Sequence, residues 1–185
     1  EPAGNQTGIL APTFSSWIDQ SQATKYGYKF DATKAQSLLT TAGYSKGSDG
    51  IFKSSDGKRL SFDIISISGY TDWTASLQVI AQNLKSVGIE IKEHDIAQND
   101  YATALYNGNY QLAYGTLSTS PGPSPFYELR NTLDSATTAD IGQTAGGDYE
   151  RYKNPSVDSL FDQFAATGDS SKQHSLMSQI QKSML

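Results

Sequence analysis

The sequence predicts an α/β fold, and three observations along the chain support that prediction. Segments with apolar residues at helical spacing alternate with shorter segments whose apolar residues have the spacing of strands. Glycines and helix-capping residues stand at most of the boundaries between these segments. A strand, a helix and a second strand also follow one another over residues 60–92, which is the pattern of a parallel βαβ unit.

The whole chain, residues 1–185, is expected to form a single lobe taken from a longer protein. Residues 1–30 are expected to be an irregular lead-in that contains one short helical turn. Residues 31–185 are expected to form the α/β lobe itself. Its first helix begins after Asp31, whose carboxylate can accept the N–H bonds that a first turn leaves open, and ends at Gly43.

A β-hairpin with its turn at Asp56-Gly57 is predicted next, because this dipeptide favours the turn geometry that matches strand twist. Its second arm, residues 60–67, is apolar on both faces, which is typical of a central strand. The helix that follows carries an apolar stripe from Trp73 to Val87 and ends at Gly88. The next strand, beginning at residue 89, completes the βαβ unit.

The second half of the chain continues this alternation. A helix is predicted over residues 99–107, followed by a short apolar strand over residues 110–117. Three further helices are predicted from their start signals. Ser124-Pro125 and Asn154-Pro155 each pair a capping side chain with a proline whose missing N–H costs nothing in a first turn, and Asp169 opens the last helix.

The composition excludes several classes of function. The net charge is −5 and no cluster of Lys and Arg stands out, which argues against nucleic acid and anionic membrane surfaces as partners. The absence of cysteine excludes thiolate metal sites and thiol catalysis. The two histidines, His94 and His174, lie on different predicted elements, so we expect no metal site and no cofactor.

The sequence carries no catalytic motif that would indicate an enzyme. It has no G-x-S-x-G elbow, no phosphate-binding loop and no dinucleotide-binding fingerprint. Pairs of carboxylates for glycoside hydrolysis remain open, because any two of the 19 acidic residues can meet in space. We therefore expect a binding module, with a hydrolase fragment or accessory domain as the alternative from another class.

Two segments are candidates for ligand binding, because ligands of open α/β sheets bind beyond the carboxyl ends of strands. Residues 68–73 and 118–125 both follow a predicted strand and carry polar or aromatic side chains that suit a sugar or a peptide. Trp73 can instead belong to the core, and Asp72 can simply cap its helix. The candidate ligand residues are Tyr70, Asp72, Trp73, Ser118, Ser120, Pro121, Gly122 and Tyr127.

The second of these segments contains an unusual concentration of proline. Pro121, Pro123 and Pro125 are three of the six prolines in the chain. A loop held rigidly in its bound shape loses less entropy on binding, which raises affinity, and Gly122 would let the backbone approach a ligand closely. The structural alternative is that these prolines only turn the chain and start a helix.

Three stretches of the chain resemble one known protein family. They are "YKFDATKAQSLLTTAGYSKGSDGIFKSSDGKRLSFDI", "IAQNLKSVGIEIK" and "YERYKNPSVDSLFDQFAAT", and together they extend the likeness over about residues 20–185. The pattern is similar to that of the family 5 extracellular solute-binding proteins, the peptide, nickel and oligosaccharide receptors of ABC importers. Its hallmarks are an aspartate that opens a helix, a Leu-Leu and an Ala-Gly-Tyr, here Asp31, Leu38, Leu39, Ala42, Gly43 and Tyr44.

This resemblance implies a fold and a function. The fold would be a periplasmic-binding-protein-like lobe of type II, similar to domain III of the dipeptide-binding protein, with a mixed sheet and flanking helices. The function would be the capture of oligopeptides for ABC import. The full-length protein would then dock on ABC permease subunits at the extracellular face of the membrane or in the periplasm. A lipid anchor would hold it there, and the fragment would be monomeric.

The chain also departs from the family's usual pattern. Many peptide receptors of the family have a Trp and an Asp-Pro where this chain has "STSPGPSPFY". The combination of "GYTDW" with "GPSP" is more similar to the branch that includes binders of β-linked oligosaccharides. No histidine falls in either candidate loop, which disfavours nickel. Oligosaccharide capture is therefore the alternative function within the family.

Overall fold

Contacts within the chain divide it into two compact units, each of which is described by itself. The computed structural model describes residues 6–9, 12–27, 29–116 and 122–185. The sheet unit consists of Lys29–Leu105 with Asn109–Gly115. The helical unit consists of Glu1–Tyr28, Tyr106–Gly108 and Thr116–Leu185.

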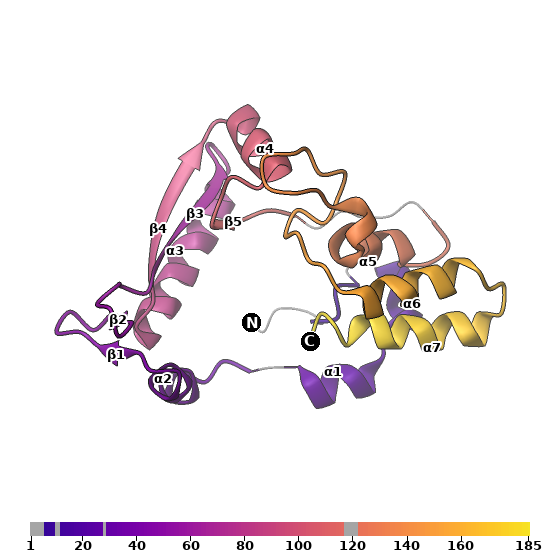
Figure 1. Cartoon of the computed structure of the whole chain (residues 1–185), viewed down its shortest axis with the longest axis horizontal. Coiled ribbons are helices and arrows are strands. Elements are labelled where there is room, and N and C mark those ends of the chain that lie inside the picture. Colours follow the sequence, from indigo (N-terminus) through magenta and orange to yellow (C-terminus); the bar gives the residue numbers. More distant parts are fainter. Residues whose placement is uncertain (1–5, 10–11, 28, 117–121) are drawn as a thin grey trace. The chain divides into compact units, whose positions relative to one another are not determined.

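A three-stranded parallel sheet is the centre of the sheet unit (Figure 1). Strand β3 (Ser61–Ile67) lies between β4 (Glu90–Ile96) and β5 (Leu112–Ala113) and pairs in parallel with both. The register with β4 runs from Ser61 opposite Glu90 to Ile67 opposite Ile96. The predicted parallel βαβ unit and the central position of its first strand are therefore confirmed.

Helix α3 (Thr71–Val87) connects β3 to β4 and packs against both strands. Leu77 and Val87 are buried on its inner side, as its apolar stripe predicts. Gly88 ends the helix in the left-handed conformation, with φ at 93°. The N–H of Ile89 then donates to the carbonyl of Leu84, which returns the chain toward β4.

The turn of the predicted hairpin lies where it was predicted, but its two arms pair over only a short stretch. Lys53 and Arg59 form a single antiparallel bridge around the turn at Asp56-Gly57, where Gly57 has φ at 83°. The first arm, β2 (Phe52–Lys53), instead pairs with β1 (Ser45–Lys46) in a separate two-stranded antiparallel sheet. The second arm continues into β3 and so leaves the hairpin for the parallel sheet.

Two more helices complete the sheet unit. Helix α2 (Ala32–Thr41) packs against α3, and its cap is the predicted Asp31, which accepts from the N–H of Lys34 at 2.8 Å. Helix α4 (Gln98–Asn107) follows β4, and its last two residues group with the helical unit. The α/β class is thus confirmed, with the antiparallel pairing confined to β1 and β2 and to the bridge at the hairpin among the residues described.

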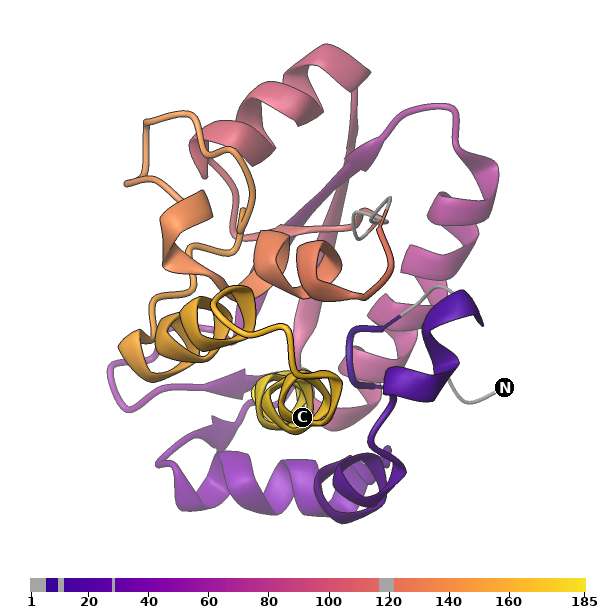
Figure 2. The same cartoon turned by 90° about the vertical axis from the view of Figure 1, so that its right-hand side faces the viewer.

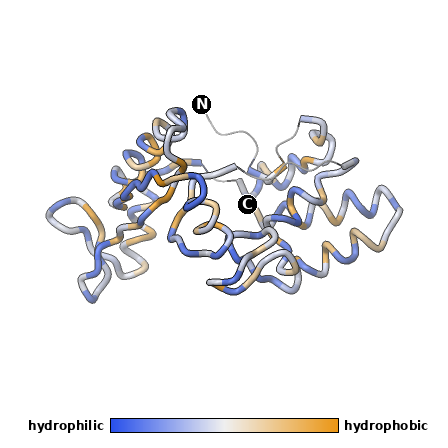
Figure 3. The backbone as a smooth tube through the Cα atoms, turned by 90° about the horizontal axis from the view of Figure 1, so that it is seen from above, coloured by the Kyte–Doolittle hydropathy of each residue, from blue (hydrophilic) through white to orange (hydrophobic). Residues whose placement is uncertain are grey.

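The helical unit is built around α6 (Pro155–Ala165) and α7 (Ser170–Gln181), which lie side by side in Figures 1 and 2. Figure 3 shows hydrophobic and hydrophilic residues alternating along both helices. Their inner sides meet α5 (Phe126–Leu133) in one core. Its buried residues are Ile9, Phe14, Leu129, Leu133, Val157, Phe161, Phe164, Leu176, Met177 and Ile180.

The start signals of α6 and α7 are confirmed. Asn154 accepts from the N–H of Ser156 at 3.1 Å, and Asp169 accepts from the N–H of Lys172 at 2.7 Å. The predicted cap at Ser124 is wrong by one position. Pro125 itself is the N-cap of α5 and makes no side-chain capping bond. Its buried ring packs inside the unit, so packing rather than capping fixes where this helix begins.

Three shorter helices also belong to the described part of the helical unit. Residues 12–17 form the 3₁₀-helix η1 (Pro12–Trp17), and α1 (Gln20–Tyr26) follows, capped by Asp19. A second 3₁₀-helix, η2 (Ser135–Thr137), lies between α5 and α6. The rest of the segment between these two helices has neither helix nor strand.

Candidate functional site

The carboxyl end of β3 leads directly into the first candidate segment. The strand ends at Ile67, and Gly69, with φ at 92°, turns the chain toward α3. Tyr70 occupies the N-cap position of that helix without a side-chain capping bond. A positive φ of this kind favours glycine, so the turn that presents Tyr70 is encoded locally.

Three aromatic rings gather at this end of the sheet and are called the aromatic cluster. The ring centroids of Tyr70 and Trp73 are 5.0 Å apart with the rings tilted by 39°. The ring of Tyr114, which follows β5, meets Trp73 edge to face at 5.4 Å. Tyr70 is 43% exposed and Trp73 is half-buried. The cluster therefore offers ring surface to solvent while Trp73 is held between two neighbours.

Backbone contacts fix the position of Tyr114. Its N–H donates to the carbonyl of Ile65 at 2.9 Å, and its own carbonyl accepts from the hydroxyl of the buried Tyr101 at 3.0 Å. A Cβ added to the next residue, Gly115, would lie 2.5 Å from that hydroxyl oxygen. A side chain at this position would therefore displace the hydroxyl of Tyr101, which holds this side of the cluster.

Asp72 lies in the first turn of α3 and is exposed. It is not the capping residue, because Tyr70 holds the N-cap position. A carboxylate in a first turn interacts favourably with the positive end of the helix dipole. The alternative in which Asp72 caps its helix is therefore not what the structure contains.

The remaining predicted ligand residues lie on the second candidate segment or, in the case of Tyr127, just after it. Ser118, Ser120 and Pro121 fall outside the described residues. Gly122 is exposed. Tyr127 is 51% exposed in the first turn of α5, where its ring packs edge to face on Phe126 with centroids 5.2 Å apart. Gly122 and Tyr127 belong to the helical unit and the aromatic cluster to the sheet unit.

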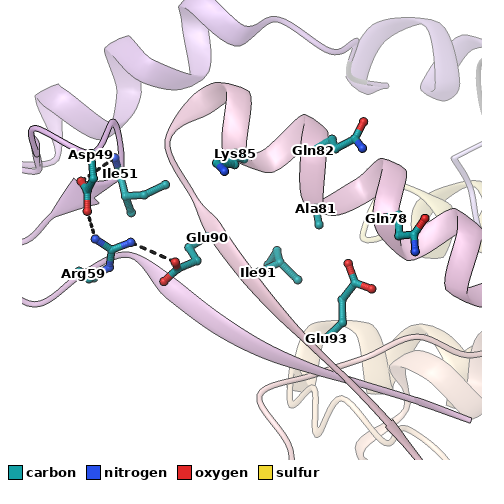
Figure 4. A pocket seen from close by; sticks show the side chains of 10 residues that line it. All are labelled: Asp49, Ile51, Arg59, Gln78, Ala81, Gln82, Lys85, Glu90, Ile91 and Glu93. Carbon is teal, nitrogen blue, oxygen red and sulfur yellow. Dashed lines mark hydrogen bonds and ion pairs between the residues drawn. The ribbon is translucent and has the colours of Figure 1, made fainter. Parts of the chain in front are cut away.

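A separate pocket of about 450 Å³ lies between α3 and β4 (Figure 4). Ile51, Ala81 and Ile91 give it apolar surface. Arg59 forms ion pairs there with Asp49 and, at 3.0 Å, with Glu90, so its charge is already balanced. None of the five predicted ligand residues that the structure describes lines this pocket, whose β4 residues are Glu90, Ile91 and Glu93.

The two histidines make ordinary local contacts. His94 is exposed on β4, and its Nε2 lies 2.8 Å from a carboxylate oxygen of Asp63 on β3. His174 stacks on Trp17 with the ring centroids 3.9 Å apart. Among the residues that the structure describes, no group of three or more His, Cys, Asp or Glu side chains is arranged to hold a metal ion.

One buried titratable group was not anticipated from the sequence. Asp148, in the loop before α6, is fully buried, and burial raises the pKa of its carboxyl group to about 6. The nearby charges of Glu150 and Asp158 also raise this pKa, while the N–H of Tyr152 and the charge of Arg151 lower it. Asp148 lies in the helical unit, outside every candidate ligand segment.

No helix in the described part of the chain is both long and apolar enough to span a membrane. The sequence model of the bacterial extracellular solute-binding proteins, family 5 Middle, matches residues 2–139. A probable ABC transporter-binding protein from Deinococcus radiodurans is 34% identical over 95 residues, which is 51% of this chain and 16% of that protein.

The solved structures that are similar to this chain include two proteins with a bound ligand. One is the mannohexaose-bound periplasmic oligopeptide-binding protein of an oligopeptide ABC transporter from Thermotoga maritima. It has 26% identity and a TM-score of 0.88, with 98% of this chain and 34% of that chain covered. The other is the pentapeptide-bound oligopeptide-binding protein of Thermus thermophilus, at 20% identity and a TM-score of 0.71. The alignment covers 94% of this chain and 30% of that protein, and at this identity it supports the fold alone.

The predicted fold class and the family resemblance are therefore confirmed. The chain spans about a third of the length of these two structural relatives and a smaller share of the curated one. The family match extends over more than half of the chain and includes the whole sheet unit with its aromatic cluster. The chain belongs to the family 5 bacterial extracellular solute-binding proteins.

Proposed function

We propose that this chain is a ligand-binding part of the solute-binding component of an ABC importer, and that it captures oligopeptides. The aromatic cluster carries this proposal. It stands at the carboxyl end of the central strand, where open α/β sheets bind ligands, and it keeps the ring of Tyr70 exposed. Exposed aromatic surface of this kind is common where a protein binds another molecule.

A receptor rather than an enzyme is the role we assign to this site. The family and the similar structures are binding proteins, and the sequence has no G-x-S-x-G elbow, phosphate-binding loop or dinucleotide-binding fingerprint. In the full-length protein, two lobes would close around the ligand by a hinge motion and exclude water from it. The loaded protein would then meet its permease at the extracellular face of the membrane or in the periplasm, monomeric and held by a lipid anchor.

An oligosaccharide is the second candidate ligand, and the arrangement of the rings favours it. Aromatic faces present large, rigid apolar surfaces that match the apolar faces of sugar rings, whereas the charged ends of a peptide need ionic partners. The Thermotoga maritima relative, at 26% identity, is bound to mannohexaose. Both candidates use the same predicted residues, namely Tyr70, Asp72 and Trp73 with Ser118, Ser120, Pro121, Gly122 and Tyr127.

A thermal-shift panel on the full-length protein tests this proposal. Peptides of two to six residues, β-glucans and mannohexaose are added separately. A ligand that binds only the folded state must raise the melting temperature, and by more as its concentration rises above its Kd. We expect one of the two classes to do so, and mass spectrometry should recover that ligand intact. Cleavage of the ligand would support the hydrolase alternative instead, and no shift with any compound would contradict the proposal.

A further inference from the structure

We propose that Asp95 is a positioning residue that holds the aromatic cluster ready for its ligand. This inference rests on the proposed function, because it assigns to Asp95 a role in the same site. Asp95 lies near the carboxyl end of β4, is exposed, and does not belong to either candidate ligand segment. Its carboxylate joins three elements that meet at this end of the sheet.

The first contact joins β4 to β3. Ser66 and Asp95 stand opposite each other in the parallel register, and the hydroxyl of Ser66 donates to Oδ1 of Asp95. Ser66 is fully buried, so an unpaired hydroxyl there would carry a desolvation cost. A hydrogen bond to an ionised carboxylate is among the stronger side-chain hydrogen bonds in proteins. One oxygen of Asp95 is therefore anchored inside the sheet.

The second contact joins β4 to α3. The hydroxyl of Thr74 lies 3.3 Å from Oδ2 of Asp95 and equally 3.3 Å from the carbonyl oxygen of Tyr70, so its one proton is shared between these two acceptors. Thr74 directly follows Trp73, and the N–H groups of both residues donate to the carbonyl of Tyr70, each at 3.1 Å. Through Thr74, the carboxylate is thus tied to the turn that carries two of the three rings of the aromatic cluster.

The position of the two Asp95 contacts, with Ser66 and with Thr74, points to a role in binding rather than in folding alone. Helix α3 is already secured further along its length by the burial of Leu77 and Val87. The Asp95 contacts act only on its first turn, between the exposed ring of Tyr70 and the sheet. A loop that is fixed before binding loses less conformational entropy when the ligand arrives. Asp95 therefore raises affinity without touching the ligand.

The test compares Asp95→Ala with Asp63→Ala in the full-length protein. Asp63 is a matched control, since it lies on the neighbouring strand and its exposed carboxylate contacts His94 rather than α3. Amide hydrogen exchange is measured first, without ligand. Asp95→Ala should speed exchange at Trp73 and Thr74, and Asp63→Ala should not. Unchanged exchange at both amides in Asp95→Ala would overturn the inference.

Calorimetric titration with mannohexaose and with a pentapeptide then measures affinity. We expect Asp95→Ala to weaken binding of the recognised probe by about three- to tenfold, the range that one or two net hydrogen bonds supply. Thr74→Val should weaken it similarly, Thr74→Ser should restore it, and the double variant Asp95→Ala/Thr74→Val should bind no more weakly than Asp95→Ala alone.

The outcomes separate this inference from the proposed function. If the wild-type protein binds neither these probes nor any member of the wider panel, the proposed function fails and the binding role of Asp95 fails with it. If the wild type binds a probe and Asp95→Ala binds it equally well, only the positioning role is overturned. Equal losses in Asp95→Ala and Asp63→Ala would also overturn it, because the effect would then be a general weakening of the sheet.

Discussion

Asp148 has a buried carboxyl group and a strained backbone conformation. Its φ is 38°, in the left-handed region that favours glycine, and its Oδ2 has no hydrogen-bond partner among the described residues. Oδ1 accepts from the N–H of Tyr152 at 3.0 Å. Three residues on, Arg151 also has a positive φ, at 59°, and donates to the carbonyl of Tyr106 at 2.9 Å. Tertiary contacts therefore impose this loop conformation.

The raised pKa of Asp148 predicts a specific dependence of stability on pH. The folded state holds the proton up to about pH 6, whereas the unfolded chain releases it near 3.8. Between these values the folded state binds more protons, so this residue's contribution to stability falls as the pH rises. Asp148→Asn keeps an acceptor for Tyr152 and should remove that fall, which amounts to roughly 2–3 kcal/mol at most.

Urea unfolding of wild type and Asp148→Asn across the range from acid to neutral pH measures this contribution as a difference between the two proteins. The comparison with the variant is needed because other groups change the free energy of unfolding in the opposite direction as the pH rises. Asp19 is one of them, since its pKa is lowered to about 2, mainly by the Ser178 hydroxyl. Asp162→Asn, on the exposed side of α6, controls for the loss of one charge. Parallel pH profiles for wild type and Asp148→Asn would contradict the assignment.

At the scale of single residues, the sequence predicts what local chemistry decides. The caps Asp31, Asn154 and Asp169 accept hydrogen bonds from N–H groups two or three residues further along the chain. Both partners of each bond therefore lie within three or four consecutive residues of the sequence. Asp148 differs because burial by distant residues shifts its pKa. Asp95 is similar, since its partners Ser66 and Thr74 come from other elements and only the folded sheet brings them together.

At the scale of elements, two glycines that end helices provide a matched comparison. Gly43 follows α2 and Gly88 ends α3, with φ at 90° and 93° respectively. A Cβ at Gly88 would lie 2.5 Å from the ring of Phe52, which is buried, and 3.0 Å from the carbonyl oxygen of Gly50. A Cβ at Gly43 would meet no described atom within 4 Å.

Alanine at each glycine should separate backbone strain from steric conflict. We expect Gly43→Ala to cost about 1 kcal/mol, the penalty for a left-handed alanine. Gly88→Ala should cost more by about 1–3 kcal/mol, because the ring of Phe52 must also move. Chemical denaturation of both variants measures the two costs. Equal costs would mean that the contact between Phe52 and Gly88 is looser than the structure indicates.

Helices and strands were predictable where the spacing of their apolar residues repeats over many positions, and ambiguous where it does not. The stripe of α3 and the alternation in β3 extend over many residues, and both elements are found as predicted. β1 pairs through only two residues, Ser45 and Lys46, which carry no strand periodicity. Helix α5 begins one residue later than predicted, with the buried Pro125 at its N-cap. The burial of a residue depends on the packing of the whole helical unit, which a short sequence pattern does not contain.

At the scale of the whole molecule, the chain spans only part of the length of its structural relatives. It covers 34% of the Thermotoga maritima protein, and we propose that further segments of a full-length protein help to enclose the ligand. Ligand sites in proteins usually bury most of their ligand. We expect the isolated 185-residue chain to bind the recognised ligand more than about tenfold more weakly than the full-length protein. Calorimetry that gives equal affinities for the two would refute this expectation.

The central claim is that the aromatic cluster binds the ligand, and titration of full-length Trp73→Ala tests it most directly. Leu77→Ala is the comparison, since Leu77 is fully buried on the same helix and its loss should cost about 2–5 kcal/mol of stability. Trp73 is only half-buried, so Trp73→Ala should cost less stability than Leu77→Ala. The account predicts that Trp73→Ala weakens ligand binding by at least about tenfold while the folded protein persists. Unchanged affinity together with a stability loss as large as that of Leu77→Ala would show that Trp73 is a core residue and would contradict the claim.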